Sequence, residues 1–177
     1  MNLLETERLM IRELEINDAS LIYKYSIEKS MQEELPDQVY ENLNEAREVI
    51  KFLTTNYKST PQSYPLVYGV ALKETNTLIG HVGLSETSSG IEIGYAIAMD
   101  DQGKGYATEA VGAFSKWAKC NLNLNAIYGI LKASNKRSQK VLSNSHFVFC
   151  EEVVMKSFGG KYLNKIYVYK YSKIQSR

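Results

Sequence analysis

The segment from Gln102 to Ala110 has the composition of a turn that binds an anion. Gly103 and Gly105 allow the backbone to turn sharply and to approach a ligand closely. Apolar residues recur at helical spacing from residue 107 to residue 118, so a helix is expected directly after the turn. The first amides of a helix have no partner within it, and the helix dipole favours an anion there. Because an expected strand at 91–98 leads into this turn, the segment is predicted to bind a phosphate-bearing cofactor.

Two residues distinguish this turn from other glycine-rich phosphate motifs. A P-loop requires G-x-x-x-x-G-K-[ST], whereas Lys104 is followed by a glycine without that spacing. A dinucleotide-binding G-x-G-x-x-G motif requires a third glycine at the position of Thr108. On the glycines alone, a strand-to-helix turn that binds no ligand stays open as the alternative.

Four separated elements of the sequence together resemble one family. Gln102-x-x-Gly105-x-Ala107 resembles the Q/R-x-x-G-x-G/A acyl-CoA motif of the GNAT N-acetyltransferase superfamily. Residues 4–12, 103–110 and 135–138, together with Phe147, are similar to the branch that contains the ribosomal-protein alanine N-acetyltransferases (RimJ/RimL-like). The resemblance implies an α/β (mixed α+β) fold in which helices cover both faces of a mostly antiparallel, twisted sheet. It also implies transfer of an acetyl group from acetyl-CoA to a primary amine, on a protein N-terminus, a polyamine or another small amine.

Acetylation of an amine by direct attack requires a base, because an alkyl ammonium with a pKa of about 10 has no lone pair. Glu92 lies between Ile91 and Ile93 on the expected strand, where desolvation can raise the pKa of a carboxylate. In some enzymes of the resembled family the Glu of a similar run is the general base. Glu92 is therefore predicted to take the proton directly or through an ordered water. The alternative is a polar residue on the solvated side of a half-buried strand.

The resemblance assigns the remaining chemistry to two places. The backbone of Ile97 and Ala98 is expected to bind the pantetheine arm and the thioester carbonyl, although both residues also suit an ordinary strand. Asn135 is expected to hold the pantetheine arm of the cofactor. Ser138, the second catalytic candidate, is expected to hydrogen-bond the sulfur of coenzyme A. An Asn at this place is also a normal helix cap. Many family members carry a Tyr general acid seven residues after this Asn, where this chain has Leu142.

Charged residues complete the predicted site. Lys104, Lys136 and Arg137 lie near the two loops that would surround the cofactor phosphates and are expected to contact them, with surface charge as the alternative. The acidic stretch from Glu28 to Glu45 would favour a cationic amine or a basic peptide N-terminus if it lined the acceptor cleft. The predicted cofactor-binding residues are Ile97, Ala98, Gln102, Gly103, Lys104, Gly105, Tyr106, Ala107, Thr108, Asn135, Arg137 and Ser138.

Composition argues against several other functions. The 177 residues include 21 Lys and Arg against 20 Asp and Glu, a net charge of +1, which gives no footprint for nucleic acid or an anionic membrane. Cys120 and Cys150 are too few for a disulfide framework and lack metal-site spacing, so we expect no metal and reduced thiols in the cytoplasm. There is no 18-residue apolar run or signal-peptide pattern. We expect one domain over residues 1–177, and a homodimer is common among similar proteins.

Sequence periodicity predicts the elements that must position these residues. Four helices are expected: one at 19–26, one at 44–56, one directly after the glycine turn and one within 133–144. Strands are expected at 9–14, 66–72, 78–84, 91–98, 126–131, 147–154 and 165–171. A turn is expected at 85–90 and a glycine-containing connection at 156–161. Two other functions stay open at this point. One is a non-catalytic acyl-CoA-binding sensor on the same fold, and the other is a nucleotide-binding protein that uses the same turn.

Overall fold

The computed structural model describes residues 1–59, 62–88, 90–156 and 163–171. The strands in these residues are β1 (Asn2–Glu5), β2 (Leu9–Arg12), β3 (Leu66–Leu72), β4 (Leu78–Thr87), β5 (Gly90–Ile97), β6 (Ile127–Lys132), β7 (Val148–Lys156) and β8 (Leu163–Tyr171). They form one sheet with the order β1-β2-β3-β4-β5-β6-β8-β7. Neighbouring strands are antiparallel, except that β5 and β6 are parallel.

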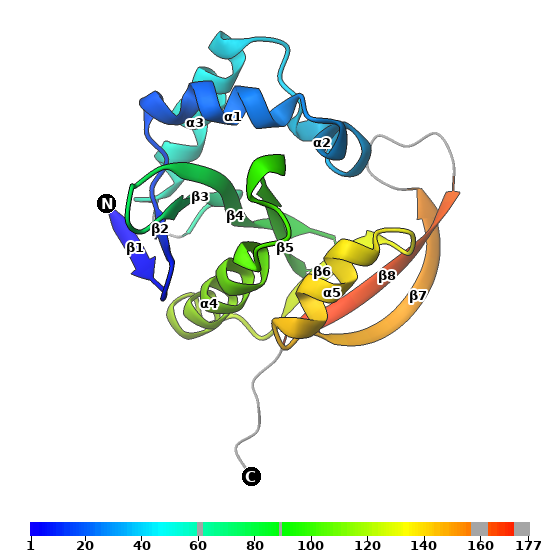
Figure 1. Cartoon of the computed structure of the whole chain (residues 1–177). Coiled ribbons are helices and arrows are strands. Elements are labelled where there is room, and N and C mark those ends of the chain that lie inside the picture. Colours follow the sequence, from blue (N-terminus) through cyan, green and yellow to red (C-terminus); the bar gives the residue numbers. More distant parts are fainter. Residues whose placement is uncertain (60–61, 89, 157–162, 172–177) are drawn as a thin grey trace.

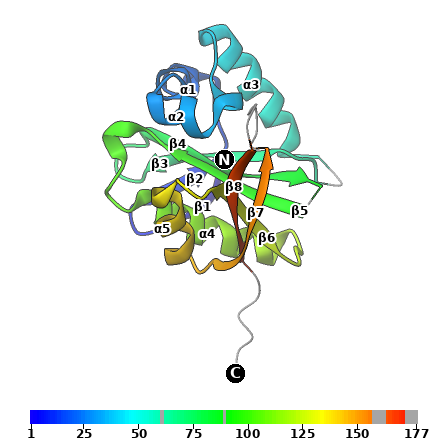
Figure 2. The same ribbon diagram turned by 90° about the vertical axis from the view of Figure 1, so that its right-hand side faces the viewer.

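Helices cover both faces of the sheet (Figures 1 and 2). They are α1 (Ala19–Ser26), α2 (Lys29–Glu34), α3 (Leu43–Asn56), α4 (Tyr106–Asn121) and α5 (Lys136–Asn144), with short 3-10 turns η1 (Ile16–Asp18), η2 (Pro36–Gln38) and η3 (Met99–Asp101). The first three helices lie on one side of the sheet, and α4 and α5 lie on the other. The predicted mixed, mostly antiparallel sheet between helices is confirmed. No helix within the described ranges is both long and apolar enough to cross a membrane.

Alternate residues of the central strand β5 belong to different layers of the core, as the pleat of a strand requires. Ile93 and Ile97 pack in the same buried cluster as Phe114 of α4. Ala96 packs instead with buried residues of α1 and α3. Glu92 is an even-numbered residue like Ala96, so its side chain is directed toward the face that α1, α2 and α3 cover.

The parallel strands β5 and β6 are paired at one register only. Glu92 lies opposite Tyr128 near the start of both strands, and the described residues beyond this point have no further pairing. The two strands therefore diverge toward their C-terminal ends, where α4 and α5 begin (Figure 1). Ligands of open sheets bind at such carboxyl ends.

A buried ion pair fixes the start of the first helical layer. The Arg12 guanidinium donates to both carboxylate oxygens of Asp18, at 2.8 Å each. Asp18 also accepts a hydrogen bond from the backbone amide of Glu15 at 2.8 Å. Both side chains of the pair are buried, so the desolvated charges depend on each other.

The predicted boundaries agree with the structure where the pattern is strong. The helix at Ala19–Ser26 and the strand at Leu66–Leu72 have the predicted bounds. The predicted turn at 85–90 is shorter in the structure, because β4 continues to Thr87, which is paired with Gly90 of β5. The strand β1 and the six-residue helix α2 were not predicted. Of the expected connection at 156–161, residues 157–161 lie outside the described residues.

Candidate active site

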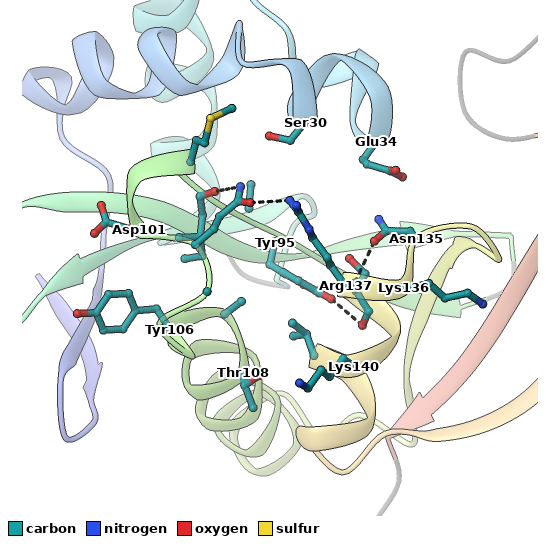
Figure 3. Close-up of a pocket in the computed structure, with 18 of the residues that line it drawn as sticks. Ser30, Glu34, Tyr95, Asp101, Tyr106, Thr108, Asn135, Lys136, Arg137 and Lys140 are labelled. Atoms are coloured by element: carbon teal, nitrogen blue, oxygen red, sulfur yellow. Dashed lines mark hydrogen bonds between the residues drawn. The ribbon is translucent and has the colours of Figure 1, made fainter.

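A cleft of about 1030 Å³ opens where β5 and β6 diverge. It extends from the N-terminal ends of α4 and α5 to the helix α2 on the other side of the sheet (Figure 3). The predicted cofactor-binding residues that line it are Ile97, Gln102, Gly103, Gly105, Tyr106, Ala107, Thr108, Asn135, Arg137 and Ser138. One cleft thus brings together residues from three separate segments of the chain. Glu92, Ala98 and Lys104 are not among its lining residues.

The glycine turn leads directly into the N-terminus of α4. Gly103 and Gly105 have φ angles of +77° and +86°, a region that glycine adopts without strain. Gly105 is the N-cap residue of α4 and has no side chain with which to cap the helix. The first bond within the helix runs from the Glu109 amide to the Gly105 carbonyl, at 3.1 Å. The amides of residues 106–108 precede that bond and can bind an anion in the cleft.

The N-terminus of α5 is capped differently. The Asn135 side-chain oxygen accepts a hydrogen bond from the Ser138 amide at 3.0 Å, so this Asn is a helix cap that also lines the cleft. Lys136, Arg137 and Lys140 add three cationic side chains to the lining (Figure 3). Lys140 was not predicted as a site residue. Helical spacing could have indicated it, because residues three and four apart share one face of a helix.

Gln102 connects the two loops across the cleft. Its Nε2 donates to the Ile97 carbonyl at 2.8 Å, and its Oε1 accepts from Arg137 Nη1 at 3.2 Å (Figure 3). The Ile97 carbonyl therefore points away from β4. Since the amide and carbonyl of one residue point the same way in an antiparallel pair, the Ile97 amide also faces the cleft.

The other two predicted cofactor contacts are engaged elsewhere. The Ala98 amide donates to the Ile79 carbonyl of β4 at 2.8 Å, so it is directed away from the diverging strands. Lys104 Nζ is paired with Asp101 Oδ1 at 2.8 Å. Of the two backbone amides predicted to contact the cofactor, only that of Ile97 therefore faces the cleft. Of Lys104 and Arg137, both predicted to contact the cofactor phosphates, only Arg137 lines the cleft.

Tyr95 is a cleft residue that the sequence analysis missed. Its side chain extends from β5 toward α5, where its hydroxyl donates to the Ser138 carbonyl at 3.4 Å (Figure 3). Burial raises the pKa of Tyr95 to about 12, so the phenol stays protonated at neutral pH. Leu142, at the position where many family members carry a tyrosine, is buried against Gly129. Tyr95 and Ser138 are therefore two of the hydroxyl-bearing residues on this side of the cleft, together with Tyr106, Thr108 and Ser134.

Glu92 lies on the same face of β5 as the cleft residue Ala96, about 13 Å along the strand. Burial raises its pKa to about 7. Gly94 is between them, and no atom lies within 4 Å of the position that a Cβ at this residue would occupy. This open space lies between the cleft and the carboxylate. A base with a pKa near neutral pH is suited to accept a proton from an amine.

The helix α2 lines the opposite end of the cleft from the glycine turn. Ser30, Glu33 and Glu34 contribute polar side chains there. Lys132 of β6 lies 3.9 Å from the Glu34 carboxylate and donates to the Glu33 carbonyl, so part of the acidic charge is balanced. Only this part of the predicted acidic stretch lines the cleft. Among the described residues, no group of three His, Cys, Asp or Glu side chains is arranged to hold a metal ion.

Known proteins share both the sequence pattern and the fold. A family model described as an acetyltransferase (GNAT) domain matches residues 8–148. The uncharacterized N-acetyltransferase p20 of Bacillus licheniformis is 27% identical over 150 residues, which cover 83% of each chain. The solved structure of ribosomal-protein-S5-alanine acetyltransferase from Vibrio fischeri matches with a TM-score of 0.82 and 20% identity, covering 98% of each chain. RimL, a ribosomal L7/L12 alpha-N-protein acetyltransferase in complex with coenzyme A, matches with a TM-score of 0.78 and 16% identity, covering 97% of this chain and 98% of that one. Since the family model spans most of the sequence, this chain belongs to the GNAT family of acetyltransferases.

Proposed function

We propose that this protein transfers the acetyl group of acetyl-CoA to a primary amine in a ternary complex, with Glu92 as the general base. One observation carries the proposal. A single cleft connects uncapped amides at the N-terminus of α4 with the point where β5 and β6 diverge, and a carboxylate with a pKa of about 7 lies on β5 beside an open glycine position. The amides can bind the diphosphate of coenzyme A, and the carboxylate can accept a proton from the amine.

The chain has groups for each part of the cofactor. The amides of residues 103–108 would hold the diphosphate, with Arg137 and Lys140 adding charge-assisted contacts. The Ile97 amide, which faces the cleft, would bind the pantetheine arm. The Tyr95 amide faces the same way and lies about 7 Å nearer to Glu92 along the strand, so we assign it to the thioester carbonyl. A fixed amide there stabilises the negative charge that develops on the carbonyl oxygen.

The reaction removes two protons from the nitrogen of the ammonium and exchanges the carbon–sulfur bond for a carbon–nitrogen bond. Glu92, directly or through a water, takes a proton from the ammonium so that the amine nitrogen has a free lone pair. The nitrogen then forms a bond to the acetyl carbon, and the bond from that carbon to sulfur breaks with its electron pair on sulfur. The nitrogen loses its second proton to the departing thiolate, so a neutral amide and the thiol of coenzyme A are released, and Glu92 returns its proton to solvent. The hydroxyl of Ser138, a residue that lines the cleft, would donate a hydrogen bond to the departing thiolate. No residue becomes acylated in this scheme.

The acceptor is proposed to enter from the side of α2. Glu33 and Glu34 give this end of the cleft acidic side chains, which favour a cationic amine over a neutral one. The S5-alanine acetyltransferase and RimL are named for protein substrates. A protein or peptide N-terminus is therefore our first candidate, ahead of polyamines and other small amines. If Glu34 attracts the acceptor, Glu34→Gln should raise KM for cationic amines and leave the Kd for coenzyme A unchanged.

The test is a turnover assay with acetyl-CoA and a panel of amines that includes N-terminal peptides, polyamines and amino acid amides. We expect release of coenzyme A thiol that depends on one class of acceptor. Glu92→Gln should lower turnover by roughly 10²-fold or more, the low end for a lost general base. Glu86→Gln is the matched control, because Glu86 is an exposed glutamate on the neighbouring strand. Binding of acetyl-CoA without turnover on any amine would support a non-catalytic sensor instead.

A further inference from the structure

Arg8, in the connection between β1 and β2, contacts the glycine turn from outside the cleft. Its Nη1 donates to the Lys104 carbonyl at 3.0 Å. Its guanidinium carbon lies 4.7 Å from the centre of the Tyr106 ring. A Cβ at Gly105 would lie 3.3 Å from Arg8 Nη2, so the arginine packs directly on this residue. One side chain thus contacts three consecutive residues of the turn, although it lies almost 100 residues away in the sequence.

The same arginine neutralises a carboxylate in the first turns of α4. Arg8 Nε and Nη2 bind Glu109 Oε2 at 2.8 and 2.7 Å. Glu109 Oε1 accepts from the Arg8 amide at 2.9 Å and from the Thr6 hydroxyl at 2.6 Å. Every contact directs the carboxylate toward the connection between β1 and β2. Glu109 is the fourth residue of the helix whose first amides face the cleft.

An unpaired carboxylate at this place would oppose the binding of an anion. A negative side chain near the N-terminus of a helix interacts favourably with the same amides and the same dipole that attract a phosphate. It would also repel a diphosphate through solvent at a distance of about one helical turn. The Arg8 guanidinium opposes both effects, since it balances the charge and, together with the Thr6 hydroxyl and the Arg8 amide, holds the carboxylate on the outer side of the turn.

We propose that Arg8 is a positioning residue for the cofactor diphosphate: it holds residues 104–106 in place and keeps the Glu109 carboxylate from competing with the bound anion. This inference rests on the proposed function, because it assumes that coenzyme A binds at the N-terminus of α4. It adds a role for a residue that lies outside the cleft and contacts no reacting atom.

The experiment measures the Kd for coenzyme A by calorimetry in the wild type, Arg8→Met, Glu109→Gln and the double variant. We expect Arg8→Met to raise the Kd about five- to tenfold, the size expected for an unpaired carboxylate near a bound anion. Glu109→Gln alone should change the Kd by less than about twofold, because it removes the competing charge. The double variant should return to within about threefold of the wild type. Arg47→Met, at an exposed arginine of α3, is the matched control for loss of a positive charge.

Two further readouts separate positioning from a general loss of structure. Thermal unfolding checks that each variant is folded at the temperature of the titration. Transfer from S-acetylpantetheine, which lacks the diphosphate, should keep its kcat/KM within about twofold in Arg8→Met, because the variant acts on the diphosphate alone. Equal losses with both donors, or a double variant as weak as Arg8→Met, would overturn the inference and leave the proposed function intact. A wild-type protein that binds no coenzyme A would overturn both.

Discussion

The half-buried carboxylate of Glu92 should make the free energy of unfolding depend on pH in a defined direction. Burial raises its pKa from 4.5 to about 7. Between these two values the folded state binds more protons than the unfolded state, so the free energy of unfolding falls as pH rises. The difference of about 2.5 units, at 1.36 kcal/mol per unit, gives about 3 kcal/mol as an upper value. Because the side chain keeps some contact with solvent, we expect roughly 2–3 kcal/mol.

Glu92→Gln isolates this effect, since glutamine has nearly the same size and does not ionise. The variant should be more stable than the wild type by less than about 1 kcal/mol at pH 5 and by roughly 2–3 kcal/mol at pH 8.5, with the change centred below pH 7. Urea unfolding at half-unit steps of pH measures both free energies. For Glu86→Gln, at an exposed residue of β4, the difference in the free energy of unfolding from the wild type should not increase between pH 5 and pH 8.5.

A constant difference in the free energy of unfolding between the wild type and Glu92→Gln across this range would contradict a raised pKa of Glu92. It would mean that the carboxylate is solvated in the folded protein and has no raised pKa. Such a result would also weaken the case for Glu92 as a base, because an ordinary carboxylate is a poor acceptor for the proton of an ammonium.

Three further substitutions test the geometry of the site and its support. Gly94→Leu should fill the open space beside Glu92 and lower turnover at least about tenfold. Calorimetry should find the Kd for coenzyme A within about twofold of the wild type. Turnover equal to that of the wild type would mean that the amine does not pass through this space. Gly105→Val should cost roughly 1–2 kcal/mol in urea unfolding, because φ is +86° there, and should weaken coenzyme A binding in the same variant. Arg12→Met should leave Asp18 as an uncompensated buried charge and cost about 3–5 kcal/mol, and a loss below about 1 kcal/mol would show that the pair is not desolvated.

The parts of the site that the sequence predicted are those determined by short-range pattern. Gln102, Gly105 and Ala107 are close together in the chain, and a glycine turn before an apolar helix face has the same geometry in many proteins. The family resemblance and the fold class it implied are confirmed. Asn135 is the helix cap that the sequence allowed, and it also lines the cleft, while its contact with the pantetheine arm stays a prediction.

The parts that the sequence could not predict depend on register and on contacts distant in the chain. The direction of the Ala98 amide is set by its pairing with β4, which the amino acid types do not encode. Tyr95 has the periodicity of any strand residue, and only the divergence of β5 and β6 places it in the cleft. The helix α2 is short and anchored mainly by the buried Met31, so it leaves almost no periodic signal. The cytoplasmic location, the homodimer and the identity of the acceptor stay predictions.

An amide-resolved nuclear magnetic resonance titration with coenzyme A shows directly whether the glycine turn before α4 binds the cofactor. We expect the largest shifts at the amides of residues 103–108, the proposed contacts of the diphosphate, and at the amide of Ile97, which faces the cleft at the end of β5. The Ala98 amide, which is bonded to β4, should shift less than its neighbour Ile97. Saturable binding whose shifts lie away from the glycine turn would contradict the account, since the diphosphate would then be held by another surface.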